Sequence, residues 1–532
     1  MVMLGDDAYV VNHFKETKEL VKAISSQDIA NWILTQGYFA EQYILPPSFQ
    51  VSNFTLQAEP YRKKLKKLDR KQLINISHPK SNFSSRIFSI QHPHYFHDIV
   101  FYLEKNWNEV IEHLFNETNR IYSYSFPIAL TRKNRNEPGL SNLRTGRMIY
   151  EWLAMAERDL VLDASCYQFI ARTDITNFYS SLYTHSIAWA LHDREQALSD
   201  SGLNLFGNKI DKLIQYANDG RTNGIPIGSV LSDLIAEIIL SKIDINTSEE
   251  LKNLNFLAVR FKDDYKILCN SESEAKIILK ALGKNLSKYN LSINESKTLI
   301  QKLPDGLYRK HDREYFPHSL NNRREITFKC FEHTLLIALD IHRKYPGTSI
   351  LEKFISECFV KNKLKNQKAL KIAFSENKQR RLREIKQVIS LLFLVKRESE
   401  KLLCHVLSIC EQLYIKYRKE NDELKLYIKS TIENEVYRAS NKGSIFEIVW
   451  LIFFSRYLGL GINKARINEL VKDLDAELKK NQFYNSILES RQEIFRELKS
   501  DIGLFKAPRH FRDNTEFTLS KYLDIFDKEQ ID

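Results

Sequence analysis

The sequence predicts an α+β core followed by a long α-helical region, and three observations carry this prediction. Residues 257–269 contain two apolar, β-prone runs around Asp263 and Asp264, which predicts a hairpin with both carboxylates at its tip. A second predicted strand, residues 169–174, also ends on a carboxylate. From residue 306 onwards, apolar positions recur mainly at helical spacing.

The composition favours a large, well-packed protein with a phosphate-rich partner. The 532 residues include 79 Lys and Arg against 67 Asp and Glu, so the formal net charge is 79 − 67 = +12. Such an excess favours association with polyanions, although the charge is spread along the chain. Aromatic residues are frequent, whereas Gly and Pro are scarce, which is typical of a mostly helical protein without long linkers.

The cysteines and the hydropathy pattern favour a cytoplasmic location without a membrane partner. The six cysteines are scattered and lack zinc-type spacing. Cys404, His405 and Cys410 form a possible metal cluster, but their helix-spaced apolar neighbours favour a buried core instead. The amino terminus lacks the pattern of a signal peptide, and the longest apolar run, residues 448–454, is too short to cross a bilayer.

The amino-terminal part is predicted to be helical over residues 1–35 and again over 102–114. Between them, the prolines of segment 45–49 forbid regular structure. Residues 126–130 are predicted to be a short strand. Five cations follow, and they either clamp a triphosphate or form a basic loop: Arg132, Lys133, Arg135, Arg144 and Arg147.

The central part adds a turn, a helix and a lysine to the two carboxylate-bearing strands. Residues 223–229 predict a turn that leads into a helix with one apolar face, and the hairpin follows this helix. Residues 291–298 show a strand-turn pattern that contains Lys297. Adjacent carboxylates repel each other, so a cation such as magnesium is expected at Asp263 and Asp264. The alternative is an ordinary polar turn.

In this order, the four blocks resemble motifs A, B, C and D of the reverse-transcriptase palm, over roughly residues 120–305. The sequence Phe261-Lys262-Asp263-Asp264 is similar to the Tyr-x-Asp-Asp box of that family. Four blocks in the same order are far more specific than any one of them.

A narrower resemblance is to the abortive-infection (AbiK-type) phage-defence branch of the bacterial reverse-transcriptase-like polymerases. The segments that carry it are 177–179, 182–187 and 224–228, the helix positions Ser232 and Glu237, and the amino-terminal segments 37–39 and 45–47. The long helical carboxy-terminal region fits this branch as well, because it stands in place of an ordinary thumb.

The resemblance implies polymerisation of deoxynucleotides with two Mg²⁺ ions. Asp174 and Asp263 are expected to bind both ions, with Asp264 as the auxiliary carboxylate. Tyr179 is expected beneath the sugar, where its ring leaves no room for a 2′-hydroxyl. Gly228, Lys297 and Arg132 complete the expected substrate site. As alternatives, Tyr179 is a core aromatic and Lys297 a simple turn lysine.

Motif B departs from the family pattern, because Pro226-Ile227-Gly228 replaces the usual Pro-Gln-Gly. The loss of a polar side chain next to the nascent base pair argues against conventional template copying. The AbiK-type branch implies DNA synthesis without a template, started on a protein hydroxyl. Tyr9, Tyr38 and Tyr43 are the candidate primers, with Tyr9 the first choice because chain ends are loosely held. Each could instead be a packing residue.

The region after residue 306 is expected to form stacked helical pairs of the solenoid (HEAT-like) kind. The periodic stretches are 335–341, 385–394, 402–413, 445–458 and 487–498. A basic cluster is either a path for single-stranded product or a solvated helix face: Lys378, Arg380, Arg381, Arg383 and Lys386.

The expected domains are therefore an amino-terminal helical region with part of the fingers (1–120), a palm and fingers (121–305) and a helical domain (306–532). The expected partners are deoxynucleoside triphosphates and single-stranded DNA product, which is attached covalently if the protein primes. The family resemblance adds a homo-oligomer, trimer or hexamer. Two other functions stay open, a template-directed reverse transcriptase and a non-catalytic nucleic-acid-binding scaffold. A scaffold has no need of three converging carboxylates.

Overall fold

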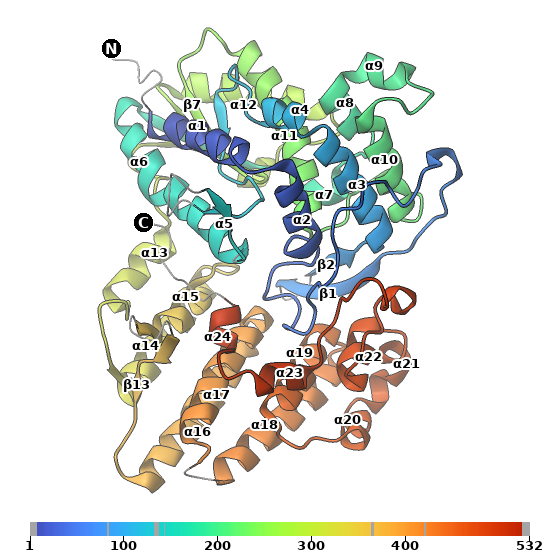
Figure 1. The fold of residues 1–532 in the computed structure, drawn as a ribbon. Helices are drawn as coiled ribbons and strands as arrows, with labels where there is room; N and C mark the ends of the chain where they lie inside the picture. Colours follow the sequence, from blue (N-terminus) through green and yellow to red (C-terminus); the bar gives the residue numbers. More distant parts are fainter. Residues whose placement is uncertain are drawn as a thin grey trace.

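The computed structural model describes residues 8–81, 84–131, 138–142, 144–362, 367–419 and 422–523. Figure 1 shows a part built around a central sheet above a second, mainly helical part, with a hairpin, β1–β2, at the boundary between them. The amino-terminal elements are α1 (Tyr9–Lys22), α2 (Ser26–Thr35), β1 (Ile74–Ser81), β2 (Ser84–Ile90), α3 (Pro93–Lys105) and α4 (Trp107–Leu114).

The central sheet is five-stranded, in the order β3-β7-β8-β6-β9. Its strands are β3 (Ile121–Ser123), β6 (Phe169–Asp174), β7 (Leu257–Phe261), β8 (Asp264–Cys269) and β9 (Leu299–Lys302). The predicted hairpin is present as the antiparallel pair β7–β8, and the predicted strand β6 is the antiparallel neighbour of β8. Three stretches far apart in the sequence therefore meet in one sheet.

The sheet is covered on both faces, because its strands alternate between two apolar clusters. Ala171 and Ile267 belong to the large core, on the face that α11 (Val230–Glu250) and α12 (Glu272–Ser287) pack against. Ile170 and Leu268 point the other way, toward a smaller cluster supplied partly by residues 154–164. Asp174 and Asp264 have the same parity as this second set, so both belong to the face that α11 and α12 do not cover.

The remaining elements of this region surround the sheet. Residues 126–129 lie in a buried loop, and only Leu130 of the predicted strand 126–130 is in a strand, so that prediction was wrong over most of its length. The elements are β4 (Leu130–Thr131), β5 (Gly139–Leu140), α5 (Arg144–Leu153), α6 (Leu160–Asp163), α7 (Phe178–Ser181), α8 (Ser186–His192), α9 (Arg194–Ser199) and α10 (Phe206–Ala217).

The helix α11 packs against α4, α8, α12 and β3 and so supports the sheet. Ser229 caps its amino terminus by accepting a hydrogen bond from the backbone N–H of Ser232, as expected for a serine at this position. The turn before it is tied to the hairpin β1–β2, because Ser89 donates its N–H to the carbonyl of Ile227 at 2.8 Å. The sequence did not predict this hairpin, in which His78 and Pro79 interrupt the β-prone pattern of β1.

The carboxy-terminal region is mainly helical, but small two-stranded sheets interrupt it. Reading it as a continuous helical solenoid is therefore not confirmed. The stretch 487–498 was also wrongly predicted as one helix, because α22 ends at Glu489. The elements are α13 (Lys310–Tyr315), β10 (Ile326–Thr327), α14 (Phe328–Lys344), α15 (Ile350–Glu357), β11 (Phe359–Asn362), β12 (Gln367–Leu370), β13 (Ile372–Ala373), α16 (Lys378–Lys396), α17 (Leu403–Tyr417), α18 (Asp422–Asn441), α19 (Ile445–Leu458), α20 (Lys464–Leu470), α21 (Asp475–Leu478), α22 (Gln482–Glu489), α23 (Pro508–Asp513) and α24 (Leu519–Tyr522).

This carboxy-terminal region packs against the proline-containing segment near residue 46. The indole N–H of Trp450 donates to the carbonyl of Ile44 at 3.3 Å. The rings of Phe49 and Phe483 lie 5.2 Å apart. The segment is irregular, as its prolines predict. It is nevertheless fixed by these contacts with the carboxy-terminal region, and Tyr43 lies directly before it.

Candidate active site

The predicted carboxylates meet at one end of the central sheet. In the antiparallel pair β6–β8, Asp174 stands directly opposite Asp264. We call these two residues the acid rung. Asp263 lies in the adjoining turn, where its carbonyl accepts the N–H of Ile175 at 3.2 Å. Lys262 adopts a positive φ of 53° in this turn, which lets the strand reverse within two residues.

The three carboxylates repel one another. The Asp264 side chain is exposed to solvent, but the surrounding protein partly desolvates it and raises its pKa to about 6, and the charges of Asp263 and Asp174 add to the effect. Burial also raises the pKa of Asp263, with a contribution from Asp174. Two carboxylates placed opposite each other in a ladder destabilise the sheet unless a cation compensates them.

The described residues compensate only part of this charge. Lys297 forms an ion pair with Oδ2 of Asp174, whereas the buried Oδ1 atom of Asp174 has no hydrogen-bond partner. No group of three or more His, Cys, Asp or Glu side chains in the described ranges is already arranged as a metal site. An orphaned carboxylate oxygen beside two further carboxylates nevertheless fits a divalent cation that takes oxygen ligands.

Tyr179 lies beside this turn and is fixed by a buried carboxylate. Its hydroxyl donates to Oδ1 of Asp233 at 2.6 Å, and burial raises the pKa of the phenol well above its usual value. Asp233 in turn forms an ion pair with Arg144 at 2.9 Å. The Tyr179 ring is half-buried against the core, and its hydroxyl is held by Asp233. Its position is therefore set before any substrate arrives.

Arg144 links this network to motif B. Its guanidinium donates to the carbonyls of Gly228 and Phe39, at 3.0 Å each. Gly228 has a φ of +130°, and an added Cβ would lie 3.1 Å from Phe88 and 3.2 Å from Ala40. Glycine is thus required here by both backbone conformation and space. The described atoms place Gly228 as a backbone support of the site.

The three candidate priming tyrosines occupy different surroundings. Tyr9 is 52% exposed and lies at the start of α1, where Asp163 accepts its backbone N–H at 3.1 Å. Tyr38 is buried, and its hydroxyl donates to the carbonyl of Gln91 at 2.6 Å.

Tyr43 is half-buried and lies near charged groups of the turn that carries Lys262 and Asp263. Burial raises the pKa of its phenol well above the usual value, the charge of Glu41 and a hydrogen bond with it add to the effect, and Arg86 and Arg144 oppose it. Glu41 lies 3.8 Å from the ammonium group of Lys262. One carboxylate thus connects Tyr43 to the turn that carries Asp263.

The predicted basic loop, the cysteines and the basic cluster of α16 can also be compared with the structure. Arg132 lies outside the described residues, as do Lys133 and Arg135 of the same basic loop. Cys404 and Cys410 are free and buried, as the core interpretation predicts. Within the predicted basic cluster of α16, Arg380 pairs with Glu384 at 3.1 Å and Lys386 pairs with Glu423.

A cleft with a volume of about 1220 Å³ opens beside the acid rung, between the sheet, residues 152–157 and the segment after β9. Asp174, Asp264 and Lys297 line one part of it, and Arg172, Lys266 and Arg309 line another. An extended substrate can therefore reach the carboxylates from solvent.

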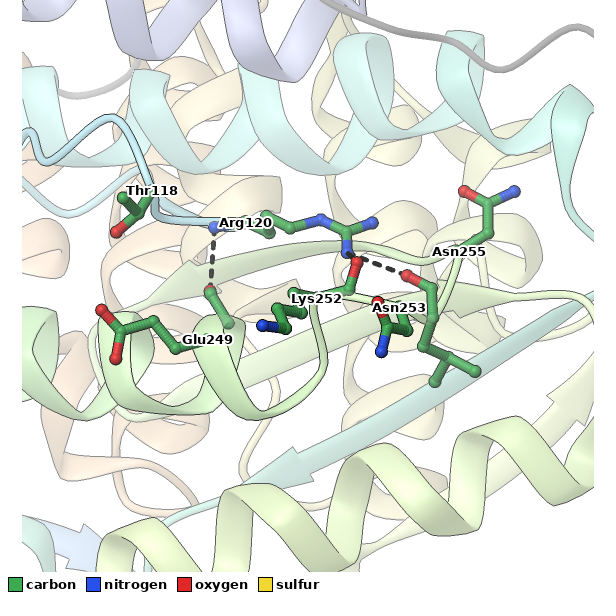
Figure 2. A pocket seen from close by; sticks show the side chains of 8 residues that line it. Thr118, Arg120, Glu249, Lys252, Asn253 and Asn255 are labelled. Carbon is green, nitrogen blue, oxygen red and sulfur yellow. Dashed lines mark hydrogen bonds between the residues drawn. The ribbon is translucent and has the colours of Figure 1, made fainter.

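A second cavity, of about 660 Å³, lies at the start of β3 and has a structural explanation (Figure 2). Arg120 donates to the carbonyl of Leu254 at 2.8 Å, and its guanidinium stacks over Phe256 at 4.6 Å. It thereby satisfies carbonyl groups that follow the end of α11. Since β3 runs parallel to β7, this cavity lies at the end of the sheet opposite the carboxylates.

Sequence reasoning missed Asp233, Arg86, Arg172, Lys266 and Arg309. A signal was present for Asp233, because a carboxylate on a largely apolar stretch of α11 needs a buried partner. The pairing of Asp233 with Arg144 has no local signal, since 89 residues separate them. Arg172 and Lys266 could have been found by stepping two residues from each predicted aspartate along its strand.

Comparison with known proteins agrees with this geometry. Residues 110–328 match the family model described as "Reverse transcriptase (RNA-dependent DNA polymerase)". The matched range contains the acid rung, Asp263, Tyr179 and Gly228. Over this range, the chain is similar to the reverse-transcriptase domain. Its mixed α/β fold and helical carboxy-terminal region agree with the fold class predicted from the sequence.

A bacterial protein shares part of this domain. The chain is 28% identical, over 173 residues, to the Retron Se72 reverse transcriptase of Salmonella heidelberg (strain 579083-10). The match covers 30% of this chain and 43% of that enzyme, so the chain spans less than half of this curated relative's length.

Solved structures that align with the chain include two yeast telomerases. Apo telomerase from Candida tropicalis aligns with a TM-score of 0.31 and 12% identity, covering 85% of this chain and 70% of that one. Telomerase from Candida albicans, in complex with a fragment of telomeric RNA, aligns with a TM-score of 0.29 and 13% identity, covering 80% and 66% of the two chains. In the described ranges, no helix of this chain is both long and apolar enough to cross a membrane.

Proposed function

We propose that the chain is a nucleotidyltransferase that joins deoxynucleotides into DNA without copying a template and begins on one of its own tyrosines. The observation that carries the catalytic part is the acid rung with its orphaned Oδ1 atom, next to Asp263. This arrangement costs stability, and among the described residues Lys297 alone contacts one of the carboxylates within ion-pair distance, so its explanation is a bound cation and the phosphate that the cation brings. A non-catalytic scaffold does not account for it.

The residues that would hold Mg²⁺ are Asp174, Asp263 and Asp264. When bound, the ions lower the pKa of the attacking hydroxyl and neutralise charge on the leaving pyrophosphate. Lys297 already contacts Asp174, so its ammonium group places a positive charge next to the carboxylates that would hold the ions. The raised pKa of Asp264 means that the site holds a proton more readily than an ordinary carboxylate does.

Deoxynucleotides are the proposed substrates because Tyr179 is immobilised beside the turn by its hydrogen bond to Asp233. We expect Tyr179→Val to relax the rejection of ribonucleotides, since it opens the space beside the 2′ position. Tyr179→Phe is the matched control, because it keeps the ring and removes only the hydroxyl. The measurement is the ratio of dATP to ATP incorporation. An unchanged ratio in Tyr179→Val would make this residue a packing aromatic.

Synthesis without a template is supported by Ile227. Its side chain packs against the core and its carbonyl is engaged by Ser89, so the position offers no polar group to a template base. A template-directed reverse transcriptase is the alternative, favoured by the description of the matching family model. Sequencing of the product in the presence and absence of added RNA or DNA separates the two functions. A product complementary to the added strand would contradict the proposal.

For priming, the surroundings support Tyr43 over Tyr9 and Tyr38. The Tyr43 hydroxyl attacks the α-phosphorus of a deoxynucleoside triphosphate, so that an O–P bond forms while the bond to the β-phosphate breaks and pyrophosphate leaves. Because the phenol's pKa is raised, the attacking group starts protonated, and the adjacent Glu41 can accept its proton. The Tyr38 hydroxyl already donates a buried hydrogen bond to the carbonyl of Gln91. Tyr9 is attached through its backbone N–H to Asp163 of α6.

The experiment is peptide mapping by mass spectrometry after incubation of the protein with Mg²⁺ and a deoxynucleoside triphosphate. We expect nucleotide mass on the peptide that contains Tyr43, and its loss in Tyr43→Phe. Tyr9→Phe is the matched control and should keep the adduct. An adduct on a serine or on a carboxy-terminal peptide would overturn the priming assignment, and the nucleotidyltransferase assignment would survive.

The biological setting rests on the AbiK-type resemblance alone. We propose that the enzyme acts in the bacterial cytoplasm in abortive-infection defence against phage, as a homo-oligomer of three or six chains. Plating of phage on cells that carry the wild type or Asp263→Asn tests the defence role. Mass photometry of the purified protein tests the assembly, and a monomer would contradict it.

A further inference from the structure

The sheet carries a second pair of like charges, one step behind the acid rung. In the β6–β8 ladder, Arg172 stands directly opposite Lys266, just as Asp174 stands opposite Asp264. Both pairs lie on the same face of the sheet, and two residues along an antiparallel strand separate them by about 6.8 Å. We call Arg172 and Lys266 the cation rung. Like charges opposite each other destabilise a sheet, so this pair also requires an explanation.

A third cation joins the cation rung from the segment after β9. The guanidinium of Arg309 lies 3.7 Å above the ring of Trp152, and the ammonium group of Lys266 approaches the same ring at 5.7 Å. Burial and the charges of Arg309 and Arg172 lower the pKa of Lys266 to about 8. Three cations therefore repel one another beside one indole ring.

In the described ranges, no carboxylate lies within ion-pair distance of these cations, although Asp264 attracts Lys266, and Asp312, Asp264 and Glu157 attract Arg309, from farther away. Arg172 donates to the side-chain oxygen of Gln301 at 2.8 Å, which is a neutral acceptor. Among the described residues, none of the ion pairs within 4.0 Å involves Arg172, Lys266 or Arg309, whereas Lys353 on the same cleft is paired with Asp312 at 2.9 Å. A partly buried group of unpaired cations that opens into a cleft fits an anionic ligand.

Exposed aromatic rings follow the cations along the cleft. Tyr308 is 51% exposed and Phe316 is 78% exposed, and both line the cleft together with Trp152. Cations that track a backbone, alternating with rings on which bases stack, are the recognition pattern for single-stranded nucleic acid. A free phosphate or a nucleotide would use the cations but would not need the row of rings.

We propose that Arg172, Lys266 and Arg309, with Tyr308 and Phe316, bind the backbone and bases of the single-stranded DNA that leaves the acid rung. The assignment to product rests on the proposed polymerase function. Along the chain, Tyr179 comes after Asp174 at the end of β6, whereas Arg172 comes before it. The nucleotide beside Tyr179 and the DNA strand at the cation rung therefore lie on opposite sides of the carboxylates. This path differs from the basic cluster on α16, in which Arg380 and Lys386 already have acidic partners.

The test is binding of a fluorescent oligothymidylate of about twelve nucleotides to the full chain carrying Asp263→Asn, measured by anisotropy across a salt series. In this background, Lys266→Gln and Arg309→Gln should each reduce the slope of log K against log salt by about 0.7, because each removes one phosphate contact. Phe316→Ala should weaken binding at least about fivefold with the slope unchanged, because it removes a stacked base. Phe316 is so exposed that its replacement leaves the fold intact.

Arg380→Gln on α16 is the matched control and should leave both slope and affinity unchanged. Binding of dTTP with Mg²⁺, followed by tryptophan fluorescence, should be the same in all variants. Unchanged DNA binding in Lys266→Gln, Arg309→Gln and Phe316→Ala would overturn the inference, as would no DNA binding by the parent. Loss of dTTP affinity alone would assign the cations to the triphosphate and would equally overturn it.

The readout separates this inference from the proposed function, because the oligonucleotide is supplied and the chain is inactive. If the cleft binds DNA but the wild-type chain synthesises none, the inference stands and the proposed polymerase function is wrong. If the wild-type chain synthesises DNA but the cleft variants bind DNA like the parent, only the inference is wrong.

Discussion

Two groups of carboxylates on the same sheet and its supporting helix differ in what surrounds them. On the helix-covered face, Glu237 and Asp244 of α11 flank Arg260 of β7, which contacts them at 2.9 Å and 2.7 Å. At the end of β6 and β8, Asp174, Asp263 and Asp264 lie together. In the described part of the chain, Lys297 alone forms an ion pair with one of them, while Lys262, Arg86 and Lys266 act on Asp263 and Asp264 from farther away. The first group is a structural ion network, whereas the second is the proposed catalytic site.

The pKa values alone do not distinguish the two groups. Burial raises the pKa of Asp244 to about 6, although Arg260 opposes it, and partial desolvation with like charge raises that of Asp264 to about 6 as well. The difference lies in the hydrogen-bond partners. Glu237 also accepts from Ser123 and Ser125, and Asp244 from Tyr265. Asp174 keeps a buried oxygen with no partner. Buried carboxylate oxygens without a partner also occur at Glu104, Glu352 and Glu447. The meeting of three carboxylates at one turn, rather than burial or pKa, therefore sets the proposed site apart.

The largest expected effect is on activity. Asp263→Asn should lower deoxynucleotide incorporation about a thousandfold or more, because it removes a ligand for the ions that stabilise several kcal/mol of transition-state charge. The measurement is incorporation of a radiolabelled deoxynucleotide, with circular dichroism as the control for folding. Activity within tenfold of wild type would remove Asp263 from the catalytic site.

The next effect is on stability. Arg260→Met should lower the free energy of unfolding by about 3 to 5 kcal/mol, because it leaves two buried carboxylates without their cation. Arg172→Met on the neighbouring strand is the matched control. It removes a repulsion opposite Lys266, so we expect a change within about 0.5 kcal/mol. Urea unfolding of both variants measures the difference, and equal losses would contradict the distinction drawn between the two groups.

A third kind of buried carboxyl, Glu411 of α17, has hydrogen-bond donors but no cation. The hydroxyl of Tyr457 and the N–H of Leu519 donate to it at 2.5 and 2.9 Å, and burial raises its pKa to about 7 from a usual value of 4.5. The folded state therefore holds this proton more tightly than the unfolded state does. Its contribution to stability is full below about pH 4.5 and is lost as the pH rises toward 7.

This contribution amounts to at most about 3 kcal/mol. Glu411→Gln should therefore flatten the decrease in unfolding free energy between pH 5 and pH 7. The measurement is urea unfolding at several pH values, with Glu400→Gln as a control for general charge effects. An identical pH profile in wild type and Glu411→Gln would show that the hydrogen-bond donors keep the group ionised.

The smallest effect has the opposite sign. Without a divalent cation, Asp264→Asn should raise the free energy of unfolding by a few tenths of a kcal/mol to about 1 kcal/mol, since it relieves repulsion at the acid rung and solvent screens the exposed group. Glu237→Gln is the same chemical change in the compensated network and should destabilise. If both variants lose stability equally, the acid rung is not strained.

Much of the site could be predicted because its signals are local. The strand ending at Asp174, the hairpin around Asp263 and Asp264 and the capped helix after Gly228 each follow from short-range pattern. The hairpin β1–β2 and the strands of the carboxy-terminal region could not be predicted, because short strands depend on partners elsewhere in the chain. The places of Arg172 and Lys266 follow from the spacing along each strand, but that the two face each other became visible only once β6 was paired with β8.

Binding of a divalent cation tests the central claim most directly. Mn²⁺ binding, followed by electron paramagnetic resonance in the presence of a deoxynucleoside triphosphate, can be compared for wild type, Asp263→Asn, Asp174→Asn and Glu237→Gln. The uncompensated carboxylates should be the ligands, so wild type and Glu237→Gln should bind Mn²⁺ equally and the two aspartate variants at least tenfold more weakly. Equal binding by all four chains would contradict the assignment of the acid rung and Asp263 as the catalytic centre.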